Sequence, residues 1–505
     1  MSASNKNTLL KVIGASSVGT MIEWYDFFIF GSLATVISSK FFPQDNPTAA
    51  FLSTLATFAA GFVVRPFGAL FFGRLGDLIG RKYTFMVTLL IMGGATFLIG
   101  CIPSYETIGF FAPLLVLIMR LLQGLALGGE YGGAATYVAE HAEESKRGYM
   151  TSWIQATATL GLFISLLVIM GTRASLSPAE FDNWGWRVPF WVSIFMVILS
   201  YVIRKNMSES PMFAKAKEEN KIVKNPLKES FGNKVNFKFV LLALFGMVMG
   251  QGVVWYTGQF YAMSFLENTM RVDKEQVDSL MFIALVMGTP LFLLFGWLSD
   301  KIGRKWIMLA AMLIAICSYR PIYKKMYQTT NVENKIVTGT PTVDEKQETI
   351  KDQLVQHTVT VTNYTDGTIH TLDKKIPVNA DGTLDESKKI EKFTVHINDS
   401  DKKTLILMVF IQVVFVTMVY GPIAAFLVEL FPTNIRYTSM SLPYHIGNGV
   451  FGGLLPAVGT YLVTNAKSSG NPDWYLEGLW YPIIVSAVCL VIGVIYVSNK
   501  ARKID

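Results

Sequence analysis

Twelve long apolar segments constrain the fold of this chain more than any other feature of its sequence. About 20 residues of α-helix cross the hydrocarbon core of a bilayer, and most of these segments reach that length. With 51% hydrophobic and 16% charged residues, the composition predicts an all-α integral membrane protein with twelve transmembrane helices. The segments cover residues 12–37, 50–72, 84–102, 109–135, 151–172, 187–204, 239–265, 277–298, 306–319, 404–430, 438–464 and 478–498.

The first and the ninth segments need separate arguments. The first is longer than the apolar core of a signal peptide and no small-residue cleavage site follows it, so we expect it to remain as the first helix. The ninth is short, but it reaches a spanning length if it continues through Pro321 towards Tyr323, where aromatic and basic side chains suit a membrane interface.

Lysine and arginine are distributed unevenly between the loops. A lysine-rich linker spans about 205–238, and the outer short loops carry fewer basic residues than the inner ones. The positive-inside rule therefore predicts that both termini and this linker are cytoplasmic. The same bias accounts for the net charge of +7 without a nucleic-acid partner. With the N-terminus inside, the inner short loops carry Arg74, Arg81, Lys82, Lys146, Arg147, Lys301, Arg304 and Lys305.

Three pairs of similar motifs recur in the same order in the two halves of the chain. GRLGDLIGRK (73–82) returns as GWLSDKIGRK (296–305), and GTMIEWYDF (19–27) returns as GQGVVWYTG (250–258). This order predicts two pseudo-symmetric six-helix bundles. In the third pair a Glu precedes an Arg by seven residues, as Glu140 and Arg147 and again as Glu429 and Arg436.

The offset between the two halves grows along the chain. It is 223 residues at the decapeptides and 289 at the Glu and Arg pairs, so about 66 residues were added in the second half. The added part is polar, contains the alternating stretch HTVTVTNYTDG, and carries two pairs suited to hairpin turns, Asp366–Gly367 and Asp381–Gly382. We expect a small β-rich extracytoplasmic insert between helices 9 and 10.

These boundaries predict five regions, and we expect no metal site or disulfide in any of them. Three histidines, His357, His370 and His396, are scattered on polar strands of the insert and are expected to face solvent. Three cysteines, Cys101, Cys317 and Cys489, lie in or at the ends of helices and are expected to pack as small apolar residues. The regions are an N-terminal bundle (1–205), a cytoplasmic linker (206–237), the first part of a C-terminal bundle (238–320), the insert (321–403) and the remainder of that bundle with a cytoplasmic tail (404–505).

Two carboxylates stand inside the first apolar segment. Glu23 and Asp26 are three residues apart, so they lie on the same side of a helix, about one turn from each other. An ionised carboxylate facing lipid is very costly, so each must face a water-filled cavity or a basic partner. The second half has Val254 and Thr257 at the matching positions, which favours a specific task over a shared packing role.

Basic partners for these acids are available in neighbouring segments. Arg65 lies in the second segment and Arg120 in the fourth, where Glu130 follows ten residues later. One interpretation is a proton relay, in which a carboxylate takes up a proton and releases its arginine. The other is a static buried salt bridge that only holds helices together.

Polar and aromatic residues near helix centres are the candidates for substrate contact. The offset of 289 places Gln155 opposite Tyr444, which supports both facing a central cavity. Arginine suits a carboxylate and an aromatic face suits a quaternary ammonium, so a small organic acid and a zwitterion both remain open. The candidates are Tyr25, Gln155, Trp255, Tyr256, Gln259, Tyr444, His445 and Asn448.

The repeated decapeptides resemble the cytoplasmic loop signature of the major facilitator superfamily. Within it, GTMIEWYDFFIFG, RPFGALFFGRLGDLIGRK, RLLQGLALGGEYGGA and NMSESPMF resemble the metabolite:proton symporters, which include carriers for betaine and proline, 2-oxoglutarate, citrate and shikimate. The resemblance covers nearly all of the chain except the insert. It implies that the loop signature latches the cytoplasmic side when the carrier opens outward. The gating residues would be Asp77, Arg81, Glu140, Arg147, Asp300, Arg304, Glu429 and Arg436.

The resemblance implies a proton-coupled symporter of the bacterial inner membrane, and not an enzyme. We expect it to be monomeric, to need no cofactor besides protons, and to work by rocking of its halves around a midplane site. An exporter of drugs or metabolites and a sensor that uses the insert are the alternatives. An ATP-driven pump is disfavoured because no Walker-type glycine loop is present in the sequence.

Overall fold

The computed structural model describes residues 3–43, 45, 47–205, 207–350, 353–379 and 383–498. Within them, 11 helices are long and apolar enough to cross a membrane, and the count becomes 12 if one bent pair forms a single span. This agrees with the twelve predicted segments. The bent pair is the first segment, where α1 (Ala3–Ser32) and α2 (Ala34–Phe41) meet at 63°.

The N-terminal half contains the first six spans. Its second span is broken at Val64 because Pro66, in the first turn of α4, has no amide hydrogen to continue the hydrogen-bond ladder. Short helices α6 (Tyr105–Ile108) and α9 (Pro178–Asn183) connect spans at one end. The spans after the first are α3 (Pro47–Val63) with α4 (Arg65–Leu78), α5 (Arg81–Ile99), α7 (Phe111–His141), α8 (Arg147–Ser175) and α10 (Val188–Lys205).

The C-terminal half contains the other six spans and is less regular. Its seventh span alternates α-helix with wider π-turns between Lys234 and Thr269, and such turns often occur at functional sites. The linker forms α11 (Pro211–Glu218). The spans are α12 (Lys234–Ala243) with α13 (Met249–Tyr256) and α14 (Ala262–Ser264), α15 (Lys274–Ile302), α16 (Arg304–Thr330), α17 (Asp399–Tyr420) with α18 (Ile423–Leu430), α19 (Arg436–Ile446) with α20 (Leu455–Ser468), and α21 (Trp480–Tyr496).

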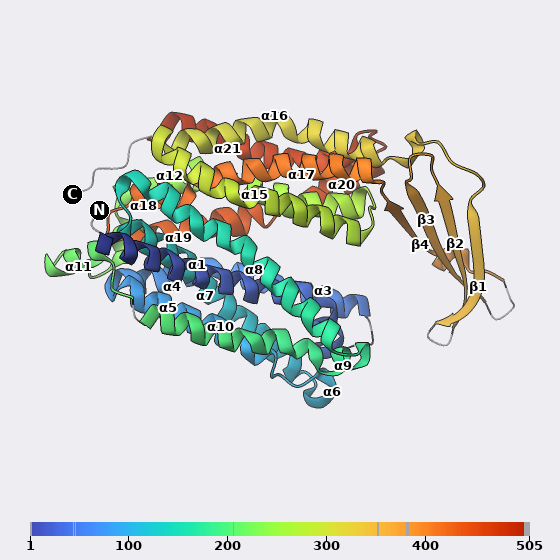
Figure 1. The fold of residues 1–505 in the computed structure, drawn as a ribbon, viewed down its shortest axis with the longest axis horizontal. Coiled ribbons are helices and arrows are strands. Elements are labelled where there is room, and N and C mark those ends of the chain that lie inside the picture. The colour runs from blue at the N-terminus through green and yellow to red at the C-terminus, as the bar shows by residue number, and fades with distance from the viewer. Residues whose placement is uncertain are drawn as a thin grey trace.

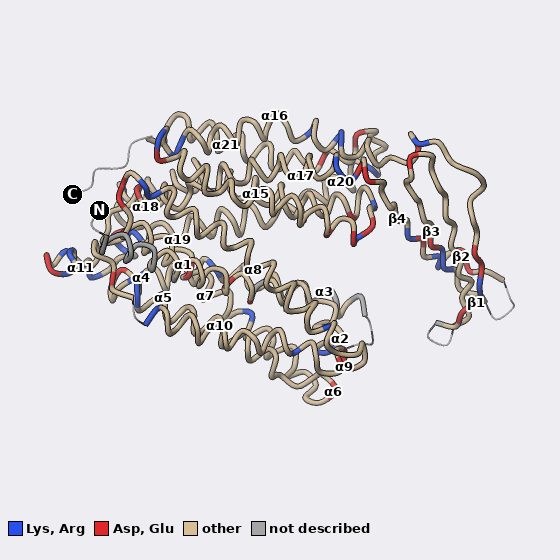
Figure 2. Tube along the Cα trace, viewed as in Figure 1, with Lys and Arg blue, Asp and Glu red and all other residues tan. Residues whose placement is uncertain are grey.

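The two halves lie side by side and diverge in one direction. The start of α1 and the end of α21 lie at the end where the halves meet, which we name the terminus-bearing end. The sheet lies beyond the other end, which we name the sheet-bearing end (Figure 1). Charged residues gather at the terminus-bearing end and on the sheet, and the middle of the helices carries few of them (Figure 2). This pattern is that of a protein that crosses a bilayer.

The insert forms a four-stranded antiparallel sheet with strand order β1-β2-β3-β4. Asp366–Gly367 makes the turn between β2 and β3 as predicted, and Gly367 has a φ of 86° there. Asp381–Gly382 lies outside the described residues. The strands are β1 (Thr342–Ile350), β2 (Gln353–Asn363), β3 (Ile369–Pro377) and β4 (Ile390–His396).

The ninth span continues through Pro321, as its length required, and extends beyond Tyr323 to Thr330. Composition placed the start of the insert at 321, but α16 continues through Pro321 to Thr330. A proline inside a helix costs one backbone hydrogen bond, and here neighbouring packing outweighs that loss, because Ile322, Tyr323 and Met326 are all buried. The polar run therefore begins inside the last turns of a helix, which composition alone does not reveal.

Candidate functional site

Two small cavities lie between the halves, near the middle of the helices. Their volumes are about 40 Å³ and about 30 Å³, which leaves room for only a few water molecules. Side chains therefore nearly fill the centre in this conformation, and a solute would need them to separate. Seven of the eight predicted substrate contacts border these cavities, namely Gln155, Trp255, Tyr256, Gln259, Tyr444, His445 and Asn448.

Aromatic side chains from both halves close this centre. The ring of Tyr131 stacks on that of Tyr444 with centroids 3.6 Å apart, and Trp24 approaches Trp255 at 6.0 Å. Gln155 donates a 2.8 Å hydrogen bond to the hydroxyl of Tyr131, and the hydroxyls of Tyr444 and Tyr420 are hydrogen-bonded. The repeat predicted that Gln155 and Tyr444 face one cavity, and Tyr131 links them. Tyr131 and Tyr420 were not predicted, because neither lies in a repeated motif.

Tyr25 is the predicted contact that does not border either cavity. Its side chain is fully buried in the N-terminal half, and its hydroxyl donates a 2.9 Å hydrogen bond to the carbonyl oxygen of Pro189. Successive helix residues are rotated by about 100°, so Trp24 and Tyr25 cannot face the same side. Trp24 faces the cavity and Tyr25 packs against α10.

Glu23 and Asp26 have different surroundings although both are buried. Glu23 borders the larger cavity together with Arg65 and interacts with it electrostatically. Asp26 is fully buried away from both cavities, near the Thr96 side chain. Neither carboxylate oxygen of Asp26 accepts a hydrogen bond of ordinary geometry from the part of the chain that the structure describes.

A polar chain leads from Asp26 to a buried arginine. The hydroxyl of Thr96 accepts a 2.7 Å hydrogen bond from Gln123, and the side-chain oxygen of Gln123 accepts one of 2.7 Å from Arg120. The guanidinium of Arg120 also lies over the ring of Phe30, 4.5 Å from its centroid. Arg120 was predicted as a partner of the acids, and these hydrogen bonds extend from it through Gln123 to Thr96, the side chain near Asp26.

Glu130 is paired with an arginine that the sequence did not reveal as a partner. Its carboxylate lies 2.5 Å from Arg204 and accepts a 2.6 Å hydrogen bond from Thr88. Arg204 is fully buried under Gly19, where a Cβ atom would come within 1.6 Å of the guanidinium. Arg204 stands at the end of the predicted sixth helix, where a basic residue is ordinarily a topology signal, so its inward side chain was missed.

The first decapeptide joins the halves at the terminus-bearing end. The fully buried carboxylate of Asp77 accepts hydrogen bonds from the backbone amides of Tyr437 and Thr438, at 3.3 and 2.8 Å, in the first turn of α19. Arg81 lies 2.8 Å from Asp77 and donates a 2.6 Å bond to the carbonyl oxygen of Thr433. An anion at a helix N-terminus stabilises the contact through both hydrogen bonding and the helix dipole.

The second decapeptide repeats this arrangement on the other side. Asp300 accepts hydrogen bonds from the amides of Gly148 and Tyr149, at 2.8 and 2.9 Å, in the first turn of α8. Arg304 lies 2.6 Å from Asp300 and 3.0 Å from Glu429. The two contacts are related by the internal repeat, and each one joins an acid of one half to a helix start of the other.

The predicted Glu and Arg pairs contribute unequally to the contacts between the halves at the terminus-bearing end. Glu140 lies 2.9 Å from Arg436 of the other half and 3.4 Å from Arg81. Arg147 instead lies 3.7 Å from the exposed Glu144 and donates to the carbonyl oxygen of Ala139. The linker also takes part, because the hydroxyl of Ser210 donates to Glu140.

The histidines and cysteines of the chain form no metal centre in the described ranges. His357 lies 2.9 Å from Asp373 and 3.2 Å from Glu348, so it is engaged within the sheet rather than facing solvent. All three cysteines are free; Cys489 is buried and packs as predicted, whereas Cys101 and Cys317 are exposed.

Known proteins similar to this chain include membrane carriers. Residues 11–340 match the model of the family described as Sugar (and other) transporter. The proline/betaine transporter of Escherichia coli (strain K12) is 29% identical over 98% of this chain and 85% of its own length. The inner membrane metabolite transport protein YhjE of the same organism is 30% identical over 91% of this chain and 89% of its own length.

Two further similarities concern proton-coupled carriers. The citrate-proton symporter of Klebsiella pneumoniae is 27% identical over 96% of this chain and 90% of its own length. The structure of the major facilitator superfamily proton:xylose symporter XylE, bound to 6-bromo-6-deoxy-D-glucose, has a TM-score of 0.68 at 14% identity, and covers 98% of this chain and 97% of that one. The chain therefore belongs to the Sugar (and other) transporter family, as a major facilitator of the metabolite:proton symporter type, and is a multi-pass inner-membrane transporter rather than an enzyme.

Proposed function

We propose that this chain imports a small organic acid or zwitterion together with protons, by alternating access at the central cavities. The observation that carries the proposal is the pair of buried carboxylates in α1, of which Glu23 borders the cavity with the candidate contacts and Asp26 lies one turn further along the helix. We place the terminus-bearing end in the cytoplasm, because the basic residues concentrate there. The carrier is proposed to work as a monomer with protons as its only coupling partner.

The mechanism uses the different surroundings of the two acids. Asp26 is fully buried, and its oxygens accept no hydrogen bond of ordinary geometry from the described residues, so an ionised carboxylate there is costly. A proton on Asp26 removes that cost, so proton uptake would accompany closure around this residue. Glu23 faces the cavity beside Arg65, where a bound solute would change their pairing. Binding of the solute and protonation of Asp26 would thus favour the same conformational change between the outward-facing and inward-facing states.

The cavity lining supports a substrate with a carboxylate. Arg65 offers a guanidinium that binds carboxylates in a two-point manner, and its position beside Glu23 means that the solute would compete with that acid. The faces of Trp255 and Tyr256 would suit the ammonium group of a zwitterion. Proline/betaine and citrate carriers are among the similar proteins, which agrees with this choice of classes.

The contacts at the terminus-bearing end are proposed to be the gate. Asp77, Asp300 and Glu140 each reach across to the other half in this conformation. They would hold the cytoplasmic side shut while the halves diverge on the outer side (Figure 1). Release of these contacts would accompany opening to the cytoplasm.

A ligand screen followed by uptake tests this function. Purified protein is screened by thermal shift against organic acids, amino acids and betaines at pH 5.5 and about pH 7.5, where a ligand bound only by the native state raises the unfolding temperature. The stabilising compounds are then offered to proteoliposomes with an imposed pH gradient. We expect accumulation that an uncoupler abolishes. Accumulation that persists with the uncoupler, or that occurs only in the outward direction, would contradict the proposal.

A further inference from the structure

A second and much larger pocket lies at the sheet-bearing end, outside the central pathway. Its volume is about 750 Å³, within the usual range for small-molecule sites. It is bordered by the outer ends of spans in the C-terminal half and by strands β3 and β4, and no residue of the N-terminal half lines it. It is therefore distinct from the cavities between the halves.

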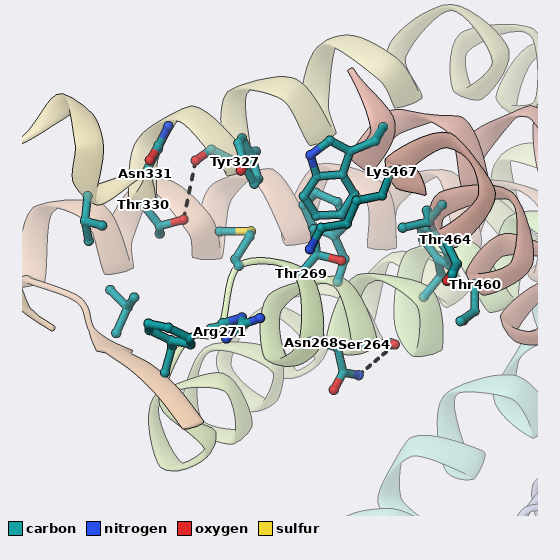
Figure 3. Close-up of a pocket in the computed structure, with 18 of the residues that line it drawn as sticks. Ser264, Asn268, Thr269, Arg271, Tyr327, Thr330, Asn331, Thr460, Thr464 and Lys467 are labelled. Carbon is teal, nitrogen blue, oxygen red and sulfur yellow. Dashed lines mark hydrogen bonds between the residues drawn. The ribbon is translucent and has the colours of Figure 1, made fainter. Parts of the chain in front are cut away.

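Helix α20 supplies one wall of this pocket with a single face. Thr460, Val463, Thr464, Lys467 and Ser468 recur at intervals of three and four residues, which places them on one side of the helix. Figure 3 shows Thr460, Thr464 and Lys467 along this wall and Arg271, Asn268 and Thr330 across from it. Four of these five residues are polar, and Lys467 is the cation among them.

The two charged side chains that line the pocket are both cationic, and each lies on an aromatic ring. The guanidinium of Arg271 is 4.7 Å from the centroid of Phe393, and the ammonium of Lys467 is 4.7 Å from that of Trp474. No acidic residue is among the described residues that line the pocket. The nearby Glu267 lies 3.1 Å from Lys274, which offsets its charge.

The sheet places Arg271 at the pocket. The amide of Val395, in β4, donates a 2.8 Å hydrogen bond to the carbonyl oxygen of Arg271, and the carbonyl of Val395 accepts one of 2.9 Å from Asp273. Arg271 has a φ of 57°, a left-handed conformation that a residue other than glycine adopts only when its surroundings stabilise it. The pocket is thus completed by the insert and would not keep this shape without it.

His370, in β3, adds a neutral polar group to the lining of the pocket. Its ring is stacked against Phe393, with centroids 5.8 Å apart. Burial, together with the neighbouring Arg271, holds the pKa of His370 below its ordinary value. The imidazole is therefore uncharged at neutral pH, and the positive charge of the pocket comes from Arg271 and Lys467.

We infer that this pocket binds a small organic anion with an apolar body, its carboxylate attracted by Arg271 and Lys467 and its body packed against aromatic side chains of the lining such as Tyr327 and Trp474. Two cations without a lining acid favour an anion, and the aromatic walls favour an apolar body. The site is outside the transport pathway, and the inference does not depend on which solute the central cavities carry. The insert then has a role, which is to build a second ligand site on the outer face.

The test uses the full-length protein in nanodiscs of phosphatidylcholine. Benzoate is titrated into it, and binding is measured by isothermal titration calorimetry. Benzamide, an uncharged molecule of the same shape, is the ligand control. We expect saturable binding of benzoate and at least about tenfold weaker binding of benzamide, which corresponds to about 1.4 kcal/mol. Equal binding of the two molecules, or no saturable binding of benzoate, would overturn the inference.

Variants assign the binding to this pocket. Arg271→Asn keeps a residue that tolerates the left-handed backbone, and Lys467→Gln changes an exposed position on α20, so the variant is expected to fold normally. We expect each to weaken benzoate binding severalfold and the double variant to abolish it. Lys325→Gln removes an exposed cation of α16 that is outside the lining and is expected to leave benzoate binding unchanged. Unchanged binding in Lys467→Gln, or equal loss in Lys325→Gln, would refute the assignment.

A second arm separates a soluble anion from a lipid headgroup, because both carry the same charge. The titration is repeated in nanodiscs that also contain phosphatidylglycerol. We expect benzoate binding to persist. Its disappearance there, with Arg271 and Lys467 still required in phosphatidylcholine alone, would assign the pocket to a lipid headgroup and overturn the soluble ligand.

Discussion

Asp77→Asn tests the contact that closes the terminus-bearing end. The Asp77 carboxylate accepts two backbone hydrogen bonds from the other half, at the start of α19. Hydrogen bonds to a charged group contribute about 1.5–3 kcal/mol each, roughly twice a neutral one. An asparagine keeps one acceptor and turns its NH2 group towards the second amide, so the conformation closed at this end should lose about 2–4 kcal/mol. That shifts the conformational equilibrium roughly 30- to 700-fold towards opening at this end.

The shift is measurable as a distance between the halves at the sheet-bearing end. Spin labels are placed at the exposed Ser39 of α2 and Asn465 of α20, in a background without the three native cysteines. Double electron–electron resonance should show a long distance in the parent protein and a larger population of a short distance in Asp77→Asn. Glu144→Gln, which changes an exposed acid at the same end, should behave like the parent.

The internal repeat supplies a second test of the same reasoning. Asp300 accepts two amides of α8 in the same way, so Asp300→Asn should shift the distances in the same direction. Because the two acids contact different helices, their effects should add. An unchanged distance distribution in both variants would refute the claim that these hydrogen bonds hold the end closed.

Three further predictions concern stability. Arg204→Gln leaves Glu130 buried without its charged partner and should lower stability by about 3–5 kcal/mol, whereas adding Glu130→Gln should recover most of the loss in thermal unfolding. Tyr25→Phe should cost only about 1 kcal/mol and leave the KM for transport unchanged, because Tyr25 does not border a cavity; a raised KM would contradict this placement. Burial alone would raise the pKa of Asp366, but Lys335 holds it below the ordinary value of 3.8. The stabilisation of the sheet by this pair should therefore be present above pH 4 and lost as the pH falls through the lowered pKa, and Lys335→Gln should increase proteolysis within the sheet at neutral pH.

The sequence predicted the architecture well because its signals are periodic and repeated. The lengths of the apolar segments predicted the number of spans, and the repeated decapeptides predicted that the two halves are pseudo-symmetric. The polar insert was recognised as β-rich from its alternation and its Asp366–Gly367 pair. The spans are found in the structure because a membrane leaves few alternatives for satisfying the backbone, and the hairpin turn because Asp366–Gly367 suits one.

The site was harder to predict because it depends on how each helix is rotated in its bundle. Glu23 and Asp26 lie one turn apart, yet one faces the cavity and the other the interior of the N-terminal half. Spacing places residues on a common side but does not say which side faces which neighbour. Arg204 shows the same limit, because a long side chain at a helix end can extend inwards as readily as outwards.

The most direct test of the account is to compare accumulation with exchange in Asp26→Asn. An asparagine cannot release a proton, so this variant should still exchange labelled for unlabelled solute across proteoliposomes but should fail to accumulate it on a pH gradient. Ser39→Ala, an exposed change on α2, should do both. Accumulation by Asp26→Asn at the parent level would contradict the proposed role of Asp26 in proton coupling.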